Sequence, residues 1–504
     1  MLIGSLPAIC ARRYPKKAAV ISPGKTISFS EFNGRVNSLL DSLISRGLKK
    51  GDKIAVLSRN NAEVIEIMFA CAKAGLIYVP INFRLASPEL KFVINDASVQ
   101  LLFVSGDFLP SIDVIREELS CRDIYNLESE YEVLLRSGKA EDRELDVKPS
   151  DIFAIFYTSG TTSGPKGVVL TQENFLSAVL NHVIAYQLAP DDVCCHVMPF
   201  YHTMEASMVI CHFYVGGSNY IPDQFTGDGF WKEVSDYGIT NITLVYTMLT
   251  DILDAFERGD YQKGALRTLS AGGQSVPVDI IRRTDRVLGS NMLFQVYGLT
   301  EASPLLTYLP RSEMVLEGEA SRRLGSIGKE MFSCYVRVVD EQDKDIEPGQ
   351  FGEIIARGPN VMQGYWHRSE ETEEALRGGW LRTGDVATVD SDGYIYIVDR
   401  KKDLIISGGE NISPREVEEV IYQHPKVREC SVIGIPDDRW GEQVRAIVVL
   451  RPDETLEESE LLSFCKARLA KYKMPKSIVF VDQLPKDPVG KIQKRILRES
   501  YSNM

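Results

Sequence analysis

Apolar and polar positions along the first hundred residues follow a pattern that predicts strands alternating with helices. Three apolar runs have the length of buried strands, at 54–57, 76–79 and 101–104. Between the first two, Asn61 precedes an apolar-rich stretch over 62–74 that Gly75 follows. We expect these two residues to begin and end a helix, because asparagine caps helix N-termini and glycine ends helices. Strand–helix–strand spacing of this kind predicts parallel pairing through right-handed crossovers.

The pattern changes three times further along the chain. A polar stretch, RSGKAEDRELDVKPSD at 136–151, separates the first region from a second α/β region that we expect to begin near Ile152. From about Gly325, short β-branched runs broken by glycine and proline predict a small antiparallel barrel or sheet. Beyond residue 400, Ser413-Pro414-Arg415-Glu416 has the form of a helix N-terminus, and strand-like runs follow it. The last hundred residues therefore predict a separate α+β domain.

Composition and charge exclude several classes of protein. The formal net charge of -13 repels phosphate backbones, which argues against a nucleic-acid partner. The nine cysteines are scattered without a CxxC pair or zinc-finger spacing, which is typical of reduced thiols in a cytoplasmic protein. The apolar patch at the start is followed, not preceded, by Arg12 and Arg13, unlike a signal peptide. Without an apolar run long enough for a transmembrane segment, we expect a soluble, cytoplasmic protein.

The strongest local signal for chemistry is YTSGTTSGPKGV at 157–168. Glycines and small hydroxylated residues let the backbone approach a phosphate, so that its N–H groups act as donors, and Lys166 adds a positive charge. This is not a Walker A loop, because Pro165 precedes the lysine and Gly167 stands where serine or threonine is required. A flexible linker is the alternative, although a linker seldom places Pro-Lys-Gly directly before a strand.

This segment resembles the phosphate loop of the adenylate-forming superfamily, in the branch of the acyl-CoA synthetases and AMP-dependent CoA ligases. Further motifs resemble those of the family and follow in the family's order: PFYHTME at 199–205, AGG at 271–273, YGLTEASP at 297–304, WLRTGD at 380–385, the segment 392–418 and PKDPVGKIQK at 485–494. The resemblance implies an α/β fold whose large N-terminal domain, 1–400, holds two doubly wound α/β subdomains and a small β-barrel. A small, mobile α+β C-terminal domain, 401–504, would follow.

The resemblance also implies roles for individual residues around ATP. Contacts to the phosphates would come from Thr158, Ser159, Gly160, Thr161, Thr162 and Lys166. The adenine would lie against Ala271, Gly272, Gly273, Tyr297 and Gly298. Thr300 would hold the α-phosphate, and Glu301 would bind Mg²⁺, a hard cation that prefers oxygen ligands. Asp385, supported by Arg400, would bind the ribose hydroxyls.

Other residues would act on the acid and on the thiol. Lys491 would bridge the carboxylate and the phosphate, where negative charge develops. The small domain would rotate about Lys402 between the two half-reactions, after which Gly408 and Gly409 would leave room for the pantetheine arm of CoA. The acyl pocket would be lined by Tyr201, His202, Met204 and Met208. Glu205 either faces that pocket, where it would select a cationic tail, or bonds to a neighbouring backbone group.

The sequence therefore predicts an ATP-dependent ligase that joins a carboxylic acid to CoA through an acyl-adenylate. The two methionines favour a medium- or long-chain fatty acid or an aryl acid over a small one. The alternatives are an acyl-AMP ligase that serves a separate carrier protein, a carnitine- or betaine-type CoA ligase, luciferase-type oxidation and a non-catalytic binding homologue. The oligomeric state stays open, a homodimer included.

Overall fold

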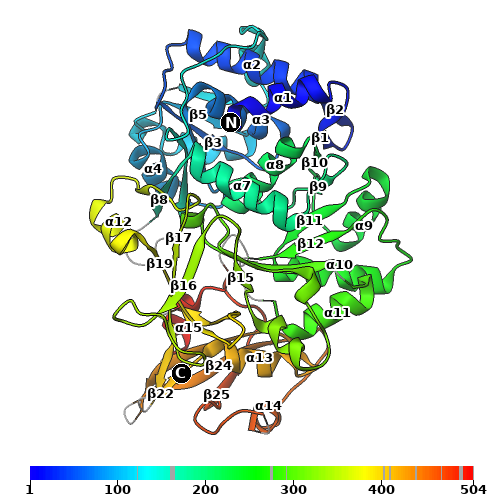
Figure 1. Ribbon diagram of the computed structural model, residues 1–504, viewed down its shortest axis with the longest axis vertical. Coiled ribbons are helices and arrows are strands. Elements are labelled where there is room, and N and C mark those ends of the chain that lie inside the picture. Colours follow the sequence, from blue (N-terminus) through cyan, green and yellow to red (C-terminus); the bar gives the residue numbers. More distant parts are fainter. Residues whose placement is uncertain are drawn as a thin grey trace.

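A computed structural model of the chain describes residues 1–502 except 122, 159–164, 273–275, 291, 401–402, 408–409, 438–439, 467 and 487–491. Figure 1 shows a large domain, built from the blue, green and yellow parts of the chain. The small C-terminal domain, in orange and red, lies below it. The predicted division into a large and a small domain is confirmed.

The first sheet of the large domain has the strand order β18-β8-β7-β4-β3-β5-β6. Its strands are β3 (Lys53–Leu57), β4 (Ile77–Pro80), β5 (Leu101–Val104), β6 (Asp123–Asn126), β7 (Ile152–Thr158), β8 (Lys166–Thr171) and β18 (Gly364–Tyr365). β3 pairs in parallel with β4 and β5, as the spacing predicts. Helix α3 (Ala62–Ala74) connects β3 and β4, with the Asn61 side chain accepting from the Val64 N–H and Gly75 in the left-handed conformation at φ 68°.

The predicted boundary near Ile152 is wrong. β7 pairs in parallel with β4 through Tyr78 and Ala154, so the chain returns to the first sheet after the polar stretch instead of starting a new one. The polar stretch at 136–151 runs over the surface and is fastened to the large domain by side chains of α2 and α3: Asn37 Nδ2 donates to Ala140 O (3.2 Å), and Lys73 pairs with Asp142. Composition alone does not distinguish such a crossing from a linker.

The second sheet has the order β15-β14-β13-β12-β11-β9-β10-β1-β2. Its strands are β1 (Ala18–Ser22), β2 (Lys25–Ser28), β9 (Val193–Cys195), β10 (Ser218–Tyr220), β11 (Asn241–Leu244), β12 (Thr268–Ala271), β13 (Leu293–Tyr297), β14 (Thr307–Leu309) and β15 (Lys329–Glu330). The neighbours from β1 through β10, β9, β11 and β12 to β13 pair in parallel. Cys194 and Cys195 are buried in β9, which confirms them as core residues.

Helices of the two sheets pack on one another in a shared core. The helices of the large domain are α1 (Leu6–Arg13), α2 (Phe29–Ser45), α3, α4 (Ser87–Asp96), α5 (Leu109–Asp113), α6 (Tyr131–Arg136), α7 (Gln172–Tyr186), α8 (Thr203–Val215), α9 (Gly227–Tyr237), α10 (Tyr246–Arg258), α11 (Val278–Leu288) and α12 (Ser369–Ala375). Phe213 of α8 meets Phe32 of α2 and Phe69 of α3 at ring-centroid distances of 4.7 and 4.4 Å. This aromatic cluster joins the helices of the first sheet to a helix of the second.

Short 3-10 helices complete the large domain: η1 (Ile3–Ser5), η2 (Gly106–Phe108), η3 (Arg116–Glu118), η4 (Thr300–Ala302), η5 (Arg311–Glu313), η6 (Glu319–Gly325) and η7 (Arg377–Gly379). The expected small antiparallel unit is a sheet of β16 (Tyr335–Val339), β17 (Gly352–Arg357), β19 (Leu381–Val389) and β20 (Ile395–Arg400). This sheet lies between the rest of the large domain and the small domain (Figure 1).

The small domain is α+β, as predicted. Its sheet runs β22-β21-β24-β23, with β25 beside β24. The elements are β21 (Ile405–Ser407), β22 (Glu410–Ile412), α13 (Pro414–Tyr422), β23 (Val427–Asp437), β24 (Gly441–Leu450), α14 (Glu458–Lys466), β25 (Ser477–Phe480) and α15 (Lys494–Tyr501). Ser413 caps α13 by accepting from the Glu416 N–H (3.2 Å), as the sequence predicts. Among the helices in the described ranges, none combines the length and apolar character that a membrane span requires.

The aromatic core around Phe213 can be tested by truncation. Phe213 is fully buried, whereas Phe332 is 54% exposed. We expect Phe213→Ala to lower the free energy of unfolding of the large domain by about 3–5 kcal/mol, because a large side chain is lost and a cavity is left. The matched control, Phe332→Ala, should change it by less than about 1 kcal/mol. Urea unfolding followed by tryptophan fluorescence measures both, and equal losses in the two variants would contradict the packing described here.

Candidate active site

The candidate site lies at the edge of the second sheet where parallel strands end. Ala271 is the last residue of β12, and Tyr297 is the last residue of the neighbouring β13. In open α/β sheets, ligands bind beyond the carboxyl ends of the strands. β13 continues through Gly298 into η4, which carries Thr300 and Glu301. The motifs at 271–273 and 297–304, which lie apart in the sequence, therefore begin at the same edge of the second sheet.

Tyr297 and Asp385 meet directly at this edge. The Tyr297 hydroxyl donates to Asp385 Oδ2 at 2.7 Å, and Asp385 is only 5% exposed. The Asp385 N–H donates to Thr383 Oγ1 (3.1 Å), which holds the backbone of the carboxylate-bearing residue. In the β19–β20 ladder Asp385 lies opposite Arg400, whose side chain lies outside the description. The predicted adenine and ribose residues are thus brought together, although they are far apart in the chain.

A second cluster joins the phosphate-loop lysine to the predicted metal ligand. Tyr365, in β18, donates its hydroxyl to Glu301 Oε1 at 2.8 Å. The Lys166 ammonium group lies over the ring of Tyr365, 5.2 Å from the centroid. Sequence reasoning did not select Tyr365, because a tyrosine after Gln-Gly carries no local signal and its role depends on contacts across the fold. The backbone also contributes, since the Met362 N–H donates to Glu301 O (2.8 Å).

Gly298 allows the segment after β13 to fold tightly onto itself. A Cβ atom at this position would lie 1.8 Å from Pro304 O, closer than any side chain can approach. Gly272, after β12, is less constrained, since a Cβ there would meet Val296 Cγ2 at an ordinary 3.5 Å. The glycine of YGLTEASP is therefore required by the local backbone, and this packing fixes where Thr300 and Glu301 lie.

The donor set fits a magnesium ion that is shared with phosphates. Glu301 offers a carboxylate and Thr300 a hydroxyl, and Mg²⁺ is commonly bound through one or two carboxylates together with substrate phosphates. Within the described ranges, no group of three or more histidine, cysteine, aspartate or glutamate side chains forms a metal cage. An ion held by Glu301 would therefore depend on the nucleotide for its remaining ligands.

His202 stands at the N-terminus of α8 and is partly buried. Burial, with a smaller contribution from Arg84, lowers the pKa of His202 to about 3, so the imidazole is neutral at physiological pH. Its Nε2 atom has no hydrogen-bond partner among the described residues. The ring lies against Tyr201 at a centroid distance of 4.3 Å. A neutral histidine held against a tyrosine suits the wall of an apolar pocket.

The two predicted pocket methionines lie on α8, one turn apart as expected. Met208 is fully buried, and the sulfur of Met204 lies 3.5 Å from His182 Nε2. Glu205, between them, is buried, and its Oε1 is 2.6 Å from His196 Nδ1. His196 Nε2 in turn contacts Asn219 Oδ1 at 2.8 Å. Both expectations for Glu205 are therefore replaced by a buried contact with His196, which follows β9 and connects Glu205 with Asn219 of β10.

Several predicted site residues lie outside the described residues: Ser159, Gly160, Thr161, Thr162, Gly273, Lys402, Gly408, Gly409 and Lys491. Their roles stay predictions. Thr158, the last residue of β7, has its hydroxyl 3.5 Å from Lys166 O. Before the segment 487–491, Lys486 forms an ion pair with Glu429 (2.8 Å). Thr158 and Lys166, on either side of the phosphate loop, pair in the β7–β8 ladder, so both flanks of the loop lie near the contact between Lys166 and Tyr365.

The buried Glu205 leads to a prediction on pH. Burial raises the pKa of Glu205 above its ordinary value of 4.5, against the opposing effect of His196. The stability that the neutral carboxyl contributes is complete below about pH 4.5 and is lost as the pH rises through the raised folded-state pKa. Glutamine cannot ionise, so the melting temperature of Glu205→Gln relative to the unmodified protein should rise between pH 5 and pH 8. We expect a melting-temperature difference that is constant with pH for the control Glu499→Gln, because Glu499 is exposed. A constant difference for Glu205→Gln would contradict the prediction.

Comparison with known proteins agrees with this geometry. The family model described as AMP-binding enzyme matches residues 8–366, and the one described as AMP-binding enzyme C-terminal domain matches 416–491. A feruloyl-CoA synthase from Amycolatopsis sp is 36% identical over 99% of both chains. An indoleacetate–CoA ligase from Aromatoleum aromaticum is 34% identical over 96% of this chain and 95% of its own.

The solved structures of MatB from Rhodopseudomonas palustris are similar to the whole chain. The ATP-bound structure aligns with a TM-score of 0.90 at 30% identity, covering 100% of this chain and 99% of MatB. The apo structure has the same coverage and identity but a TM-score of 0.80. The arrangement of the present chain is therefore closer to that of the ATP-bound protein. Family matches, relatives and site geometry agree, and the chain belongs to the AMP-binding enzyme family.

Proposed function

We propose that this protein is an ATP-dependent carboxylate–CoA ligase that activates an aryl acid as its acyl-adenylate and transfers the acyl group to CoA. The proposal rests on one observation: residues from separate motifs contact one another beside the edge of the second sheet. Tyr297 contacts Asp385, and Tyr365 connects Lys166 with Glu301. A nucleotide needs ribose acceptors, an aromatic surface and cations near its phosphates, and this edge supplies all three.

The nucleotide would be held by residues of the second sheet and of the small antiparallel sheet that contains β19 and β20. Asp385 accepts hydrogen bonds from the ribose hydroxyls, supported by Arg400, and the ring of Tyr297 stacks on the adenine. Ala271, Gly272, Gly273 and Gly298 form the wall beside the base. Because the Tyr297 hydroxyl already donates to Asp385, ring and carboxylate are positioned relative to each other before the nucleotide arrives.

The phosphates would lie between the two sheets. Lys166 and the segment with Thr158, Ser159, Gly160, Thr161 and Thr162 supply positive charge and N–H donors. Thr300 donates to the α-phosphate. Glu301 binds Mg²⁺, which neutralises phosphate charge when it is bound. The Tyr365 hydroxyl, bonded to Glu301 at 2.8 Å, fixes the direction of that carboxylate.

Two half-reactions follow from these placements. First, a carboxylate oxygen of the acid bonds to the α-phosphorus, and pyrophosphate leaves. Lys491 stabilises the charge that develops there. Next, the thiolate of CoA attacks the acyl carbon, and AMP leaves with one oxygen of the acid. The unit 1–400 binds the substrates, and the unit 401–504 carries Lys491 and turns about Lys402, bringing Gly408 and Gly409 to the site.

The acid that fits best is aryl. The proposed pocket wall combines Tyr201 and the neutral His202, just before α8, with Met204 and Met208 of α8, which would suit a flat apolar ring. The two relatives compared above are named for ferulate and indoleacetate, both aromatic acids. A carnitine- or betaine-type acid is disfavoured, because Glu205, whose side chain would have to attract its cation, is buried and bound to His196.

The cytoplasm is the proposed location. All nine cysteines are unpaired and buried, which suits a reducing compartment. ATP and CoA are available there in free form, so a separate carrier protein is not required as the acceptor. Size-exclusion chromatography of the purified protein distinguishes a monomer from a homodimer.

The proposal is tested by measuring AMP release from ATP with a panel of acids, each with and without CoA. The panel holds ferulate, indoleacetate, 2-succinylbenzoate, octanoate, palmitate, acetate and carnitine. We expect multiple turnovers only with CoA present, and fastest with an aryl acid. Adenylate that accumulates without any effect of CoA would instead indicate an acyl-AMP ligase that serves a carrier protein.

A variant separates catalysis from mere binding. Lys491→Ala should slow adenylate formation about 100-fold or more while the melting temperature is retained, since one charge-stabilising group is lost. Arg495→Ala is the matched control, because its side chain is 69% exposed and pairs with the exposed Glu499 one turn away. AMP release that is absent from the unmodified protein with every acid would instead support a non-catalytic binding protein.

A further inference from the structure

The side chain of Arg415 crosses from the small domain to the large domain. Arg415 is in the first turn of α13, and its guanidinium donates to two backbone carbonyls, Ile397 O and Gly325 O, each at 3.2 Å. Ile397 belongs to β20 and Gly325 ends η6, so one side chain binds two separate segments of the large domain. Glu419, one turn along α13, accepts from Arg415 Nε at 3.3 Å and directs the guanidinium. Only 12% of the Arg415 side chain is exposed.

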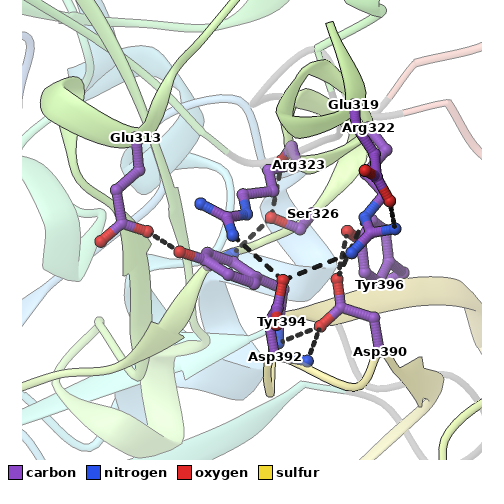
Figure 2. A network of polar contacts seen from close by, with 10 residues as sticks. Glu313, Glu319, Arg322, Arg323, Ser326, Asp390, Asp392, Tyr394 and Tyr396 are labelled. Carbon is purple, nitrogen blue, oxygen red and sulfur yellow. Dashed lines mark hydrogen bonds and ion pairs between the residues drawn. The ribbon is translucent and has the colours of Figure 1, made fainter.

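The two carbonyls are held in position by a network of charged and aromatic side chains, which Figure 2 shows from close by. Arg322 and Arg323 of η6 both reach Asp392, at 3.3 and 3.0 Å, in the turn between β19 and β20. Tyr396 of β20 donates to Asp390 Oδ2 at 2.9 Å. These contacts fasten η6 to β20. The pair of acceptors that Arg415 uses is therefore preformed on the large domain.

In the part of the chain that the structure describes, a further hydrogen bond crosses between the domains beside Arg415, from Ser413 Oγ to Val398 O at 2.5 Å. A cavity of about 1310 Å³ separates the two domains beside Arg415, with Arg322, Tyr396, Tyr472 and Lys473 among the residues that line it. Elsewhere the rings of Tyr246 and Tyr422 meet edge to face at 6.0 Å. Because a cavity lies between the domains at this point, the bonds of Arg415 contribute to the orientation of the small domain, and losing one of them shifts the population of orientations.

The observed orientation is the one suited to acid activation. Burial raises the pKa of Asp251 of α10, and the small-domain cations Arg428 and Lys486 act against that rise, so the two domains lie close together here. The whole chain also aligns better with the ATP-bound than with the apo structure of MatB, at TM-scores of 0.90 and 0.80.

We propose that Arg415 is a positioning residue for the first half-reaction: it holds the small domain in the orientation in which adenylate forms, and its bonds to Gly325 and Ile397 must break before the thiol is acylated. This inference rests on the proposed function for its two half-reactions. Hydrogen bonds from a charged donor are about twice as strong as neutral ones, so two of them suffice to bias an equilibrium between orientations.

The orientation is measured directly by energy transfer between two dyes. The natural cysteines are buried, so cysteines introduced by Val133→Cys on the large domain and Glu454→Cys on the small domain, both exposed, accept the labels selectively. With ATP and Mg²⁺, we expect one dominant distance in the otherwise unmodified protein and in Arg495→Ala. In Arg415→Ala, the fraction of molecules at a second dye-to-dye distance should be about tenfold larger. Arg415→Lys, which keeps the charge but lacks the planar fork, should behave like Arg415→Ala.

The two half-reactions are then measured separately with the fastest acid of the panel, beginning with ferulate. Acid-dependent exchange of pyrophosphate into ATP reports the first, and single-turnover transfer from preformed adenylate to CoA reports the second. Arg415→Ala should lose about tenfold in exchange and nothing in transfer. Equal losses in both half-reactions, or none in either, would overturn the proposal, because a merely structural role does not separate the two.

Failure of this proposal can be told apart from failure of the proposed function. If the unmodified protein releases no AMP with any acid, the proposed function fails, and the dye distances still decide whether Arg415 holds the orientation. If the protein is active and Arg415→Ala leaves the distance distribution unchanged, the role of Arg415 fails alone. A melting temperature within a few degrees of the unmodified protein confirms that each variant is folded.

Discussion

The hydrogen bond between Tyr365 and Glu301 is the interaction on which the site depends. Tyr365 belongs to the first sheet through β18, whereas Glu301 follows β13 of the second, so this bond of 2.8 Å ties the two sheets where their catalytic segments meet. Asn360 strengthens the connection by donating to Ala302 O (3.1 Å) and Leu305 O (2.9 Å). With the sheets held together there, Lys166 lies over the ring of the same Tyr365 whose hydroxyl is bonded to Glu301, so a cation and a carboxylate are brought to one place.

The same arrangement explains how one chain supports two reactions. In the proposed function, the residues that would bind the nucleotide belong to the large domain, whose sheets hold them. The groups proposed to alternate, Lys491 and the glycines at 408–409, belong to the C-terminal part of the sequence. The two domains meet across a cavity, with Arg415 bridging beside it, so the small domain is held by bonds that can break. In this proposal, the large domain binds the nucleotide rigidly, and the small domain carries the catalytic groups that move.

Local structure was predictable from the sequence. Contacts between residues distant in the chain were predictable only where a motif indicated them. The helix over 62–74 was predicted with both ends, because Asn61 and Gly75 act on their immediate neighbours. The boundary near Ile152 was wrong, because the pairing of β7 with β4 spans dozens of residues of intervening chain. Tyr365 and Arg415 were missed as contributors to function for a related reason: each acts through partners distant in the chain, and neither residue type is unusual at its position.

The central claim is that the acid is activated by forming a bond to the α-phosphorus of ATP. The most direct measurement follows oxygen: ferulate labelled with ¹⁸O in its carboxylate is converted in the presence of ATP, Mg²⁺ and CoA, and the AMP is analysed by mass spectrometry. The account predicts one ¹⁸O atom in each AMP molecule, carried there when the thiol displaces AMP from the adenylate. Label found in inorganic phosphate alongside ADP would show activation as an acyl phosphate and would contradict the account.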